Sequence, residues 1–309
     1  MQTERANFDE LVARAMAQPG RTAMRPVIEK ELLHLDILFA LERERLLDRL
    51  TFQGGTSLRL CQGSPRFSED LDFAGGWEFS SQHLSRIREC IEDYVSNRYQ
   101  LEVSVKEPKE LREEPGYRDI RIDKWQVSVL TAPARKDIPK QRIKLEVASL
   151  PAYTREAHAL QVHYPFLPDG YDDLLIVTEN LEEIMADKLI SLVNTQKYVR
   201  HRDIWDLAWL KQQGASPNLE LIKRKIQDYT VEHYADRARD MRSRLVEIVS
   251  GTAFRNEMTR FLPTQTVERT IRNPRFADFL AREVTAMLDQ AILALEGPPP
   301  GSPSPEFTL

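Results

Sequence analysis

The most constraining feature of this sequence is the stretch Gly54–Phe73, GGTSLRLCQGSPRFSEDLDF, which joins a glycine-rich turn to an Asp-Leu-Asp triplet. In a β-strand, residues i and i+2 point to the same face, about 7 Å apart along the chain. Asp70 and Asp72 are therefore expected to aim two carboxylates at one point, with Leu71 turned into a core. Two like charges side by side are costly unless a cation neutralises them. The triplet therefore predicts a cation site, and oxygen ligands of this kind suit Mg²⁺.

The glycine-rich turn adds a second half to this site. It follows a short apolar run that is typical of a strand and that ends at Gly54. Gly54 and Gly55 lack side chains, so a phosphate group can approach the backbone N–H groups closely. A phosphate cradle beside a metal pair indicates nucleotide chemistry.

A third carboxylate is predicted on the strand Gln141–Ala148. Its residues alternate, with Leu145 and Val147 on one face and Lys144 and Glu146 on the other. Nucleotidyl transfer uses two metal ions about 3.5–4 Å apart, and acidic groups must hold them. A Glu on any edge strand would show the same pattern, but the nearby triplet favours Glu146 as the third metal ligand.

Two charged residues interrupt apolar helix faces. Lys188 lies four residues from Ile184 and from Leu192, on the same helix face. A lysine there either reaches a phosphate as a point charge or lies at the margin of the apolar face and extends its amine to solvent. Asp203 shares its face with Leu207. It is expected to act as a general base, to position a substrate or to pair with a basic residue, unless it only complements the helix dipole.

The loop before the triplet holds two further polar candidates. Arg66 is expected either to pin this loop or to meet a phosphate, and Ser68 either to cap the turn or to join the site. His201 lies between Arg200 and Arg202 and is expected to belong to a basic patch rather than to bind a metal.

The pattern of elements predicts an α+β fold. Strand and helix signals mix up to about residue 175, and helical periodicity dominates afterwards, beginning with an N-cap at Asn180. We expect a core with N-terminal helices over residues 1–175, a helical domain over 176–296 and a disordered Pro/Ser/Gly-rich tail over 297–309.

Charge and composition narrow the class of protein. The net charge is −5, yet residues 188–282 hold more basic than acidic residues and could hold a polyanion. The nucleic-acid-binding candidates are the basic run Lys223, Arg224 and Lys225 and, as a second path, Arg135, Lys136, Lys140 and Arg142. No apolar run is long enough for a bilayer, and the only cysteines, Cys61 and Cys90, lack metal-type spacing. These features favour a reduced, cytoplasmic protein that does not span a membrane, which we expect to be a monomer.

These motifs together resemble the AbiEii/AbiGii toxin family of nucleotidyltransferase-like proteins. The resemblance rests on the Gly-Gly-Thr turn, on Arg-x-Ser-x-Asp-x-Asp from Arg66, on Lys144-Leu145-Glu146, on Ala186-Asp187-Lys188-Leu189 and on Arg202-Asp203-Ile204-Trp205-Asp206-Leu207. These motifs occur in order over residues 50–210, and the last hundred residues are less diagnostic. The third acid is a Glu, where better-known polymerases have an Asp.

The resemblance implies a polymerase-β-like nucleotidyltransferase core with an all-α C-terminal half. It also implies the toxin of a type IV toxin–antitoxin or phage-abortive system with a separately encoded antitoxin, with or without direct contact between the two. By the same match, Asp70, Asp72 and Glu146 hold metal, Lys188 contacts phosphate and Asp203 is a catalytic-site carboxylate. Some members transfer nucleotides to the ends of tRNA.

The sequence therefore predicts a Mg²⁺-dependent enzyme, with two ions, that moves an NMP from an NTP onto the tRNA 3′ end and so blocks translation. Gly54, Gly55, Thr56 and Ser57 are expected to cradle the phosphates. A protein or small-molecule acceptor remains open. So does a catalytically silent nucleotide-binding partner module, although the three carboxylates argue against that reading.

Overall fold

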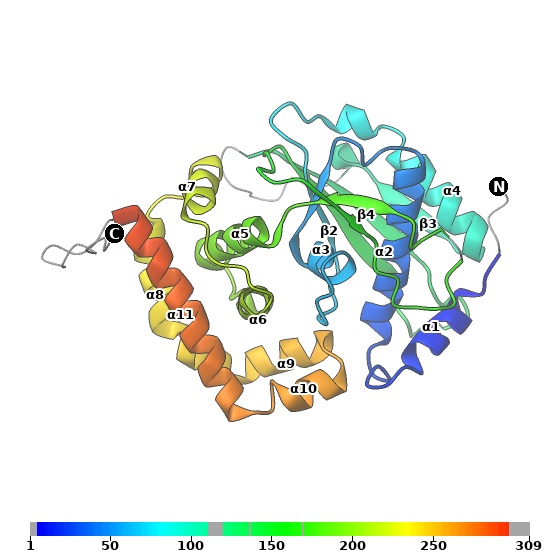
Figure 1. The fold of residues 1–309 in the computed structure, drawn as a ribbon. Coiled ribbons are helices and arrows are strands. Elements are labelled where there is room, and N and C mark those ends of the chain that lie inside the picture. Colours follow the sequence, from blue (N-terminus) through cyan, green and yellow to red (C-terminus); the bar gives the residue numbers. More distant parts are fainter. Residues whose placement is uncertain (1–4, 111–119, 136, 169, 297–309) are drawn as a thin grey trace, which may run out of the picture.

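The computed structural model describes residues 5–110, 120–135, 137–168 and 170–296 (Figure 1). The strands are β1 (Thr51–Gln53), β2 (Leu71–Ala74), β3 (Val103–Lys106), β4 (Ile122–Val129), β5 (Gln141–Ala148), β6 (Glu156–Ala159) and β7 (Leu175–Thr178). The helices are α1 (Phe8–Met16), α2 (Arg25–Arg43), α3 (Gly54–Leu60), α4 (Ile87–Tyr99), α5 (Leu181–Asn194), α6 (His201–Gln212), α7 (Leu219–Asp228), α8 (Tyr234–Ser250), α9 (Thr252–Phe261), α10 (Thr264–Arg269) and α11 (Pro274–Glu296), with 3₁₀ turns at Ser81–Leu84 and Pro108–Glu110. The tail predicted over 297–309 lies outside the described residues.

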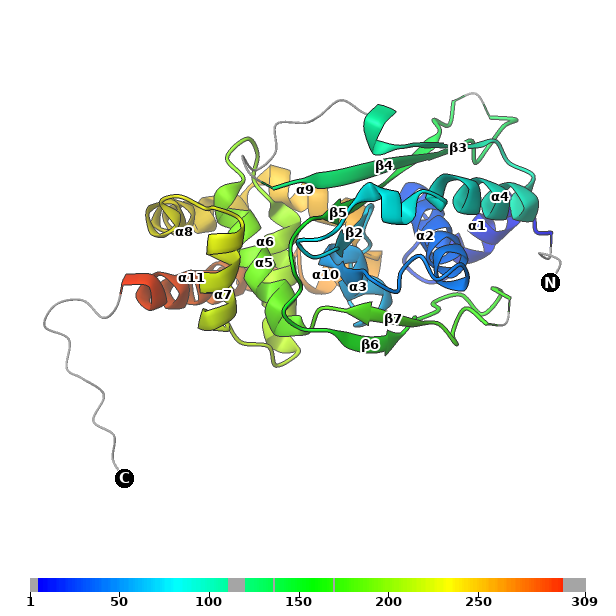
Figure 2. The same cartoon turned by 90° about the horizontal axis from the view of Figure 1, so that it is seen from above.

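The strands form one mixed sheet in the order β3-β4-β5-β2-β1-β7-β6. β2 is parallel to β5 and β1 is parallel to β7, while the remaining neighbours are antiparallel. Figure 2 shows the sheet standing between α1, α2 and α4 on one side and α5, α6, α7, α8 and α11 on the other. The predicted α+β fold is confirmed.

The buried hydrophobic residues form two clusters. The first joins α1, α2 and α4 to the inward side chains of the sheet, such as Phe73 and Leu145. The second lies among the helices from α5 to α11. Because side chains alternate along a strand, the sheet face opposite the first cluster is left to polar groups, and this face turns toward the C-terminal helices.

The C-terminal helices return to the N-terminal part of the chain (Figure 1). The amide of Phe67 donates to the carbonyl of Phe261, at the end of α9, at 2.9 Å. The amide of Thr264 donates to the carbonyl of Gly20 at 3.0 Å. The boundary predicted near residue 175 falls at the first residue of β7, and the helical part begins at Leu181. The division into two domains remains a prediction.

Candidate functional site

A row of carboxylates lies on the polar face of the sheet. In the parallel β2–β5 pair, Asp72 lies beside Glu146, while Leu71 and Leu145 are buried on the other face. Asp70 directly precedes β2, which begins at Leu71. Its carboxylate accepts the backbone N–H of Lys144 at 3.3 Å. The three predicted acids therefore line one cleft of about 410 Å³.

The electrostatics of this row favour a bound cation. Burial first, and then the neighbouring Glu146 and Asp70, raise the pKa of Asp72 to about 7. Lys124 on β4 lies 3.3 Å from Glu146 and balances that carboxylate. The donor set is all oxygen, as Mg²⁺ requires. No three His, Cys, Asp or Glu side chains of the described ranges are already gathered about one metal position, so the acids fit a cation by chemistry rather than by a preformed cage.

Two glycines let α3 approach this row. Gly54 has φ +77°, and a Cβ on it would lie 2.8 Å from Oδ2 of Asp72. A Cβ on Gly55 would lie 2.5 Å from Nη2 of Arg66 and 2.9 Å from Oγ of Ser68. Side chains at these positions would therefore collide with the site. Both glycines and Ser68 line the cleft, and their contact with a nucleotide remains a prediction.

Thr56 and Ser57 do not line the cleft, unlike Gly54 and Gly55. Their part in a phosphate cradle remains a prediction. Both side chains are buried. The Thr56 hydroxyl donates to the carbonyl of Asp70, and an imidazole nitrogen of His34 lies 3.0 Å from the carbonyl of Glu69. The reason is that α3 begins at Gly54 itself, so its next residues turn inward. Thr56 therefore positions the acidic loop.

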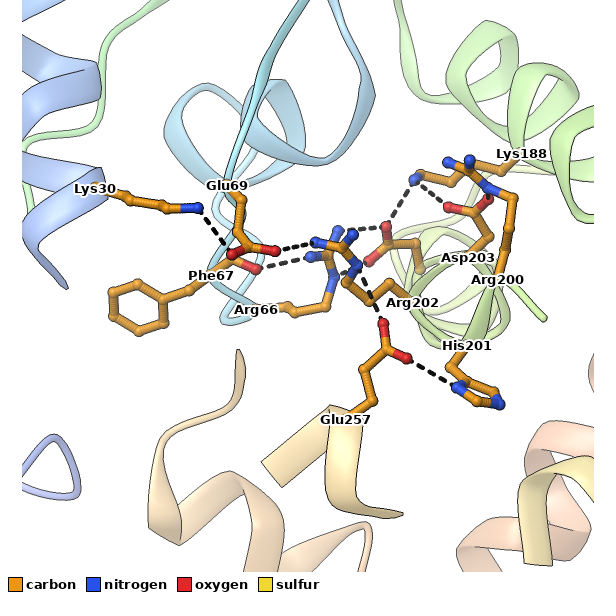
Figure 3. A network of polar contacts seen from close by, with 11 residues as sticks. Lys30, Arg66, Phe67, Glu69, Lys188, Arg200, His201, Arg202, Asp203 and Glu257 are labelled. Carbon is orange, nitrogen blue, oxygen red and sulfur yellow. Dashed lines mark hydrogen bonds and ion pairs between the residues drawn. The ribbon is translucent and has the colours of Figure 1, made fainter. Parts of the chain in front are cut away.

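Behind the cleft lies a buried network of charges (Figure 3). Arg66 donates to both carboxylate oxygens of Asp206, each at 2.6 Å, and to the carbonyl of Phe67 at 2.7 Å. Arg66 therefore pins the loop, and because it also lines the cleft, its contact with a phosphate remains a prediction. Lys188 lies 2.7 Å from Asp206 and 3.1 Å from Asp203. Asp206 was not among the predicted site residues, although its place three residues after Asp203 was a signal for it.

Asp203 is an ion-pair partner in this network. It accepts from the Ser191 hydroxyl at 2.8 Å and also bonds Arg200. Burial alone would raise the pKa of Asp203, but Lys188 and Arg200 hold it below its usual value. A carboxylate with a depressed pKa is a weak general base. Of the roles considered, pairing with basic residues is therefore the one the geometry favours.

Lys188 is nearly buried and also lines the cleft. Its Nζ is held from one side by two aspartates, which fixes it as a point charge at the cleft wall. Its contact with phosphate remains a prediction.

A second chain of ion pairs joins α9 to the loop before β2 (Figure 3). Arg202 lies 3.2 Å from Glu69 and 3.4 Å from Glu257, and Lys30 lies 2.9 Å from Glu69. His201, expected in a basic patch, instead lies 2.8 Å from Glu257. Arg202 and Glu257 line the cleft and were not predicted as site residues. The partner of each comes from a distant segment, which the sequence alone does not reveal.

The predicted nucleic-acid-binding run on α7 is wrong in one member. Lys225 is buried and lies 3.1, 2.8 and 3.1 Å from Glu179, Glu183 and Asp187. It cannot meet a nucleic acid at the surface, because it shares the apolar face of α7 with Leu221 and Ile222.

The other basic candidates are at or near the surface. Lys223 lies 3.4 Å from Glu220, and Arg224 is exposed beside the Tyr153 ring. On the second path, Arg135 pairs with Asp137 and Lys140 with Glu102. Arg142 is exposed on β5, and Lys136 lies outside the described residues.

Comparison with solved structures found several similar chains. The chain is similar to MenT4, a nucleotidyltransferase toxin from Mycobacterium tuberculosis, at 18% identity and a TM-score of 0.55, covering 92% of this chain and 90% of that one. It is also similar to JHP933 from Helicobacter pylori at 17% identity and a TM-score of 0.39, covering 87% of this chain and 93% of that one. No curated protein matches in sequence. No helix in the described ranges combines the length and apolar character needed to cross a bilayer.

The family comparison covers most of the chain. Residues 36–282 match the model described as the nucleotidyl transferase AbiEii toxin of type IV toxin–antitoxin systems. The match includes Asp70, Asp72 and Glu146 and the buried network behind them. The resemblance stated from the motifs is confirmed, and the chain belongs to the AbiEii family of nucleotidyltransferase toxins.

Proposed function

We propose that this nucleotidyltransferase moves an NMP from an NTP onto a hydroxyl of the tRNA 3′ end and so blocks translation. The observation that carries the proposal is the row of Asp70, Asp72 and Glu146 in one cleft with the fixed ammonium of Lys188. A site built only to hold a partner protein would have no need for three carboxylates whose charges oppose one another.

The carboxylate row would hold Mg²⁺, with two ions predicted. When bound, the metal neutralises charge on the transferring phosphate and favours ionisation of the attacking hydroxyl. Asp70, Asp72 and Glu146 are the residues that would supply its ligands.

The other residues bind and orient the nucleotide. The backbone at Gly54 and Gly55 can approach a phosphate because no side chain intervenes. Lys188 offers a positive charge that Asp203 and Asp206 hold in place. The acceptor oxygen forms a bond to the α-phosphorus, the bond to the bridging oxygen of the β-phosphate breaks, and pyrophosphate leaves.

Several features of the proposal extend beyond the cleft. A basic surface would hold the acceptor by its phosphates, and Arg224 and Arg142 are exposed members of the two predicted paths. We further propose a separately encoded antitoxin as the partner. Action as a cytoplasmic monomer completes the proposal.

The decisive experiment incubates the protein with each labelled NTP, total tRNA and total protein. The expected result is label on tRNA, lost by at least a hundredfold in Asp70→Asn and in Glu146→Gln. Asp289→Asn is the matched control, because this surface carboxylate on α11 pairs, within the described part of the chain, only with Arg242. Label on protein alone would show that the acceptor is a protein and not tRNA. Full activity of Asp70→Asn would refute the assignment of the carboxylate row as the active site.

A further inference from the structure

A second cavity adjoins the catalytic cleft. Its volume is about 680 Å³, within the range of roughly 300–1,000 Å³ that is typical of small-molecule sites. It lies between the segment 195–199, which follows α5, and the N-terminal half of α8. Its lining includes Lys197, Tyr198, Arg237 and Arg244. None of the three carboxylates of the cleft lines it.

Tyr198 stands between the two spaces. It lines both the second cavity and the catalytic cleft, and 62% of its surface is exposed. Its segment runs from α5, which carries Lys188, to α6, which carries Asp203. A tyrosine usually buries its ring and leaves only the hydroxyl wet. A ring exposed at this junction offers a flat face to a planar group.

The lining of the second cavity carries a net positive charge, because its three basic side chains outnumber the two carboxylates, Asp236 and Asp240. Within the described ranges, no carboxylate lies at ion-pair distance from Lys197 or Arg237. Arg237 donates instead to the neutral side-chain oxygen of Asn194 at 2.5 Å, which fixes its position and leaves its charge available. Arg244 pairs with Asp240 at 3.1 Å. Two uncompensated cations beside an exposed aromatic ring are the combination that single-stranded nucleic acids use, with bases stacked and phosphates paired.

We infer that the second cavity receives the unpaired nucleotides that precede the acceptor's 3′-terminal hydroxyl. A base stacks on Tyr198, and the neighbouring phosphates lie near Lys197 and Arg237. This route delivers the terminal hydroxyl past the ring into the cleft. The incoming NTP does not take this place, because Gly54, Gly55 and Lys188 line only the cleft. The inference rests on the proposed function, since it requires a nucleic-acid acceptor.

The first test measures binding, so that it does not depend on turnover. A fluorescent single-stranded RNA oligonucleotide is titrated with the full chain, and its anisotropy is followed. Tyr198→Ala is expected to weaken binding about tenfold or more, whereas Tyr198→Phe retains it, because the stacking ring remains. The control is Trp77→Ala, an equally exposed aromatic at 60% that lines neither space. Equal binding by Tyr198→Ala and wild type would overturn the inference.

The second test separates the acceptor from the nucleotide. In transfer to total tRNA, Tyr198→Ala is expected to raise KM for tRNA about tenfold and to leave KM for the NTP within twofold. A rise in KM for the NTP instead would place the ring against the incoming nucleotide and reject the inference. Lys197→Gln is expected to make the salt dependence of tRNA use shallower, since one phosphate contact is lost. If wild type labels no RNA, the proposed function fails, whereas labelled RNA with an unaffected Tyr198→Ala rejects this inference alone.

Discussion

Replacing Asp206 by Asn tests the buried network most directly. Asp206 is fully buried, accepts two bonds from Arg66 and lies 2.7 Å from Lys188. The amide keeps the shape but removes the charge, so Arg66 is left buried without a counter-ion. Lys188 retains only Asp203 from this pair of aspartates. Breaking a buried pair in this way costs about 3–5 kcal/mol.

The loss is measured as the change in the free energy of unfolding in urea at pH 7. For a chain of this length each kcal/mol lowers the melting temperature by about 2 °C, so a fall of about 6–10 °C is expected as well. Asp289→Asn serves as the control, because its pair with Arg242 is half exposed and is worth at most about 1 kcal/mol. The double variant Arg66→Met with Asp206→Leu is expected to recover much of the loss, since an apolar replacement removes both charges. A loss below about 1 kcal/mol in Asp206→Asn would refute this account of the network.

Three further predictions follow from the site and its surroundings. Gly55→Ala is expected to lose about 1–3 kcal/mol, because its Cβ would lie 2.5 Å from Arg66, and an unchanged urea midpoint would contradict the close approach. Burial lowers the pKa of His34 to about 4, below its unfolded value of 6.5. The neutral imidazole therefore stabilises the folded protein fully above pH 6.5, and this stabilisation is lost as the pH falls toward 4. This contribution is about 3 kcal/mol, and His34→Gln should therefore flatten the stability curve between pH 6.5 and 4, an effect that an unaltered slope would disprove. Lys188→Met keeps the side-chain stem but not the charge, so nucleotide use should fall at least tenfold, and full activity would reduce Lys188 to a packing role.

The strand periodicity of the sequence was enough to place Asp72 and Glu146 on one sheet face, whereas Asp70 lies just before β2. Alternation along β5 puts Glu146 and Leu145 on opposite faces of the sheet, and along β2 it does the same for Asp72 and Leu71. The apolar helix face with Ile184 and Leu192 likewise predicted that Lys188 faces inward. These signals are local, since each depends only on neighbours within one element.

The features that were missed depend on contacts between distant segments. The pairing of Arg66 with Asp206 spans 140 residues, and no local pattern reports it. The direction of Thr56 depended on whether α3 begins at Gly54 or later. The strand β6 was not predicted, because Glu156–Ala159 lies at the sheet edge and is mostly exposed, without a clear alternation. Lys225 was misread because a run of three charges was taken as one surface, although helical geometry divides it.

The return of α9 to the N-terminal part affects when the enzyme becomes complete during its own synthesis. Nascent chains fold from the N-terminus as they emerge, so the sheet and its carboxylates form early. The wall that contains Glu257 and the bond from Phe67 to Phe261 comes only after most of the chain has been made. The nascent protein therefore lacks one side of its cleft until late in elongation.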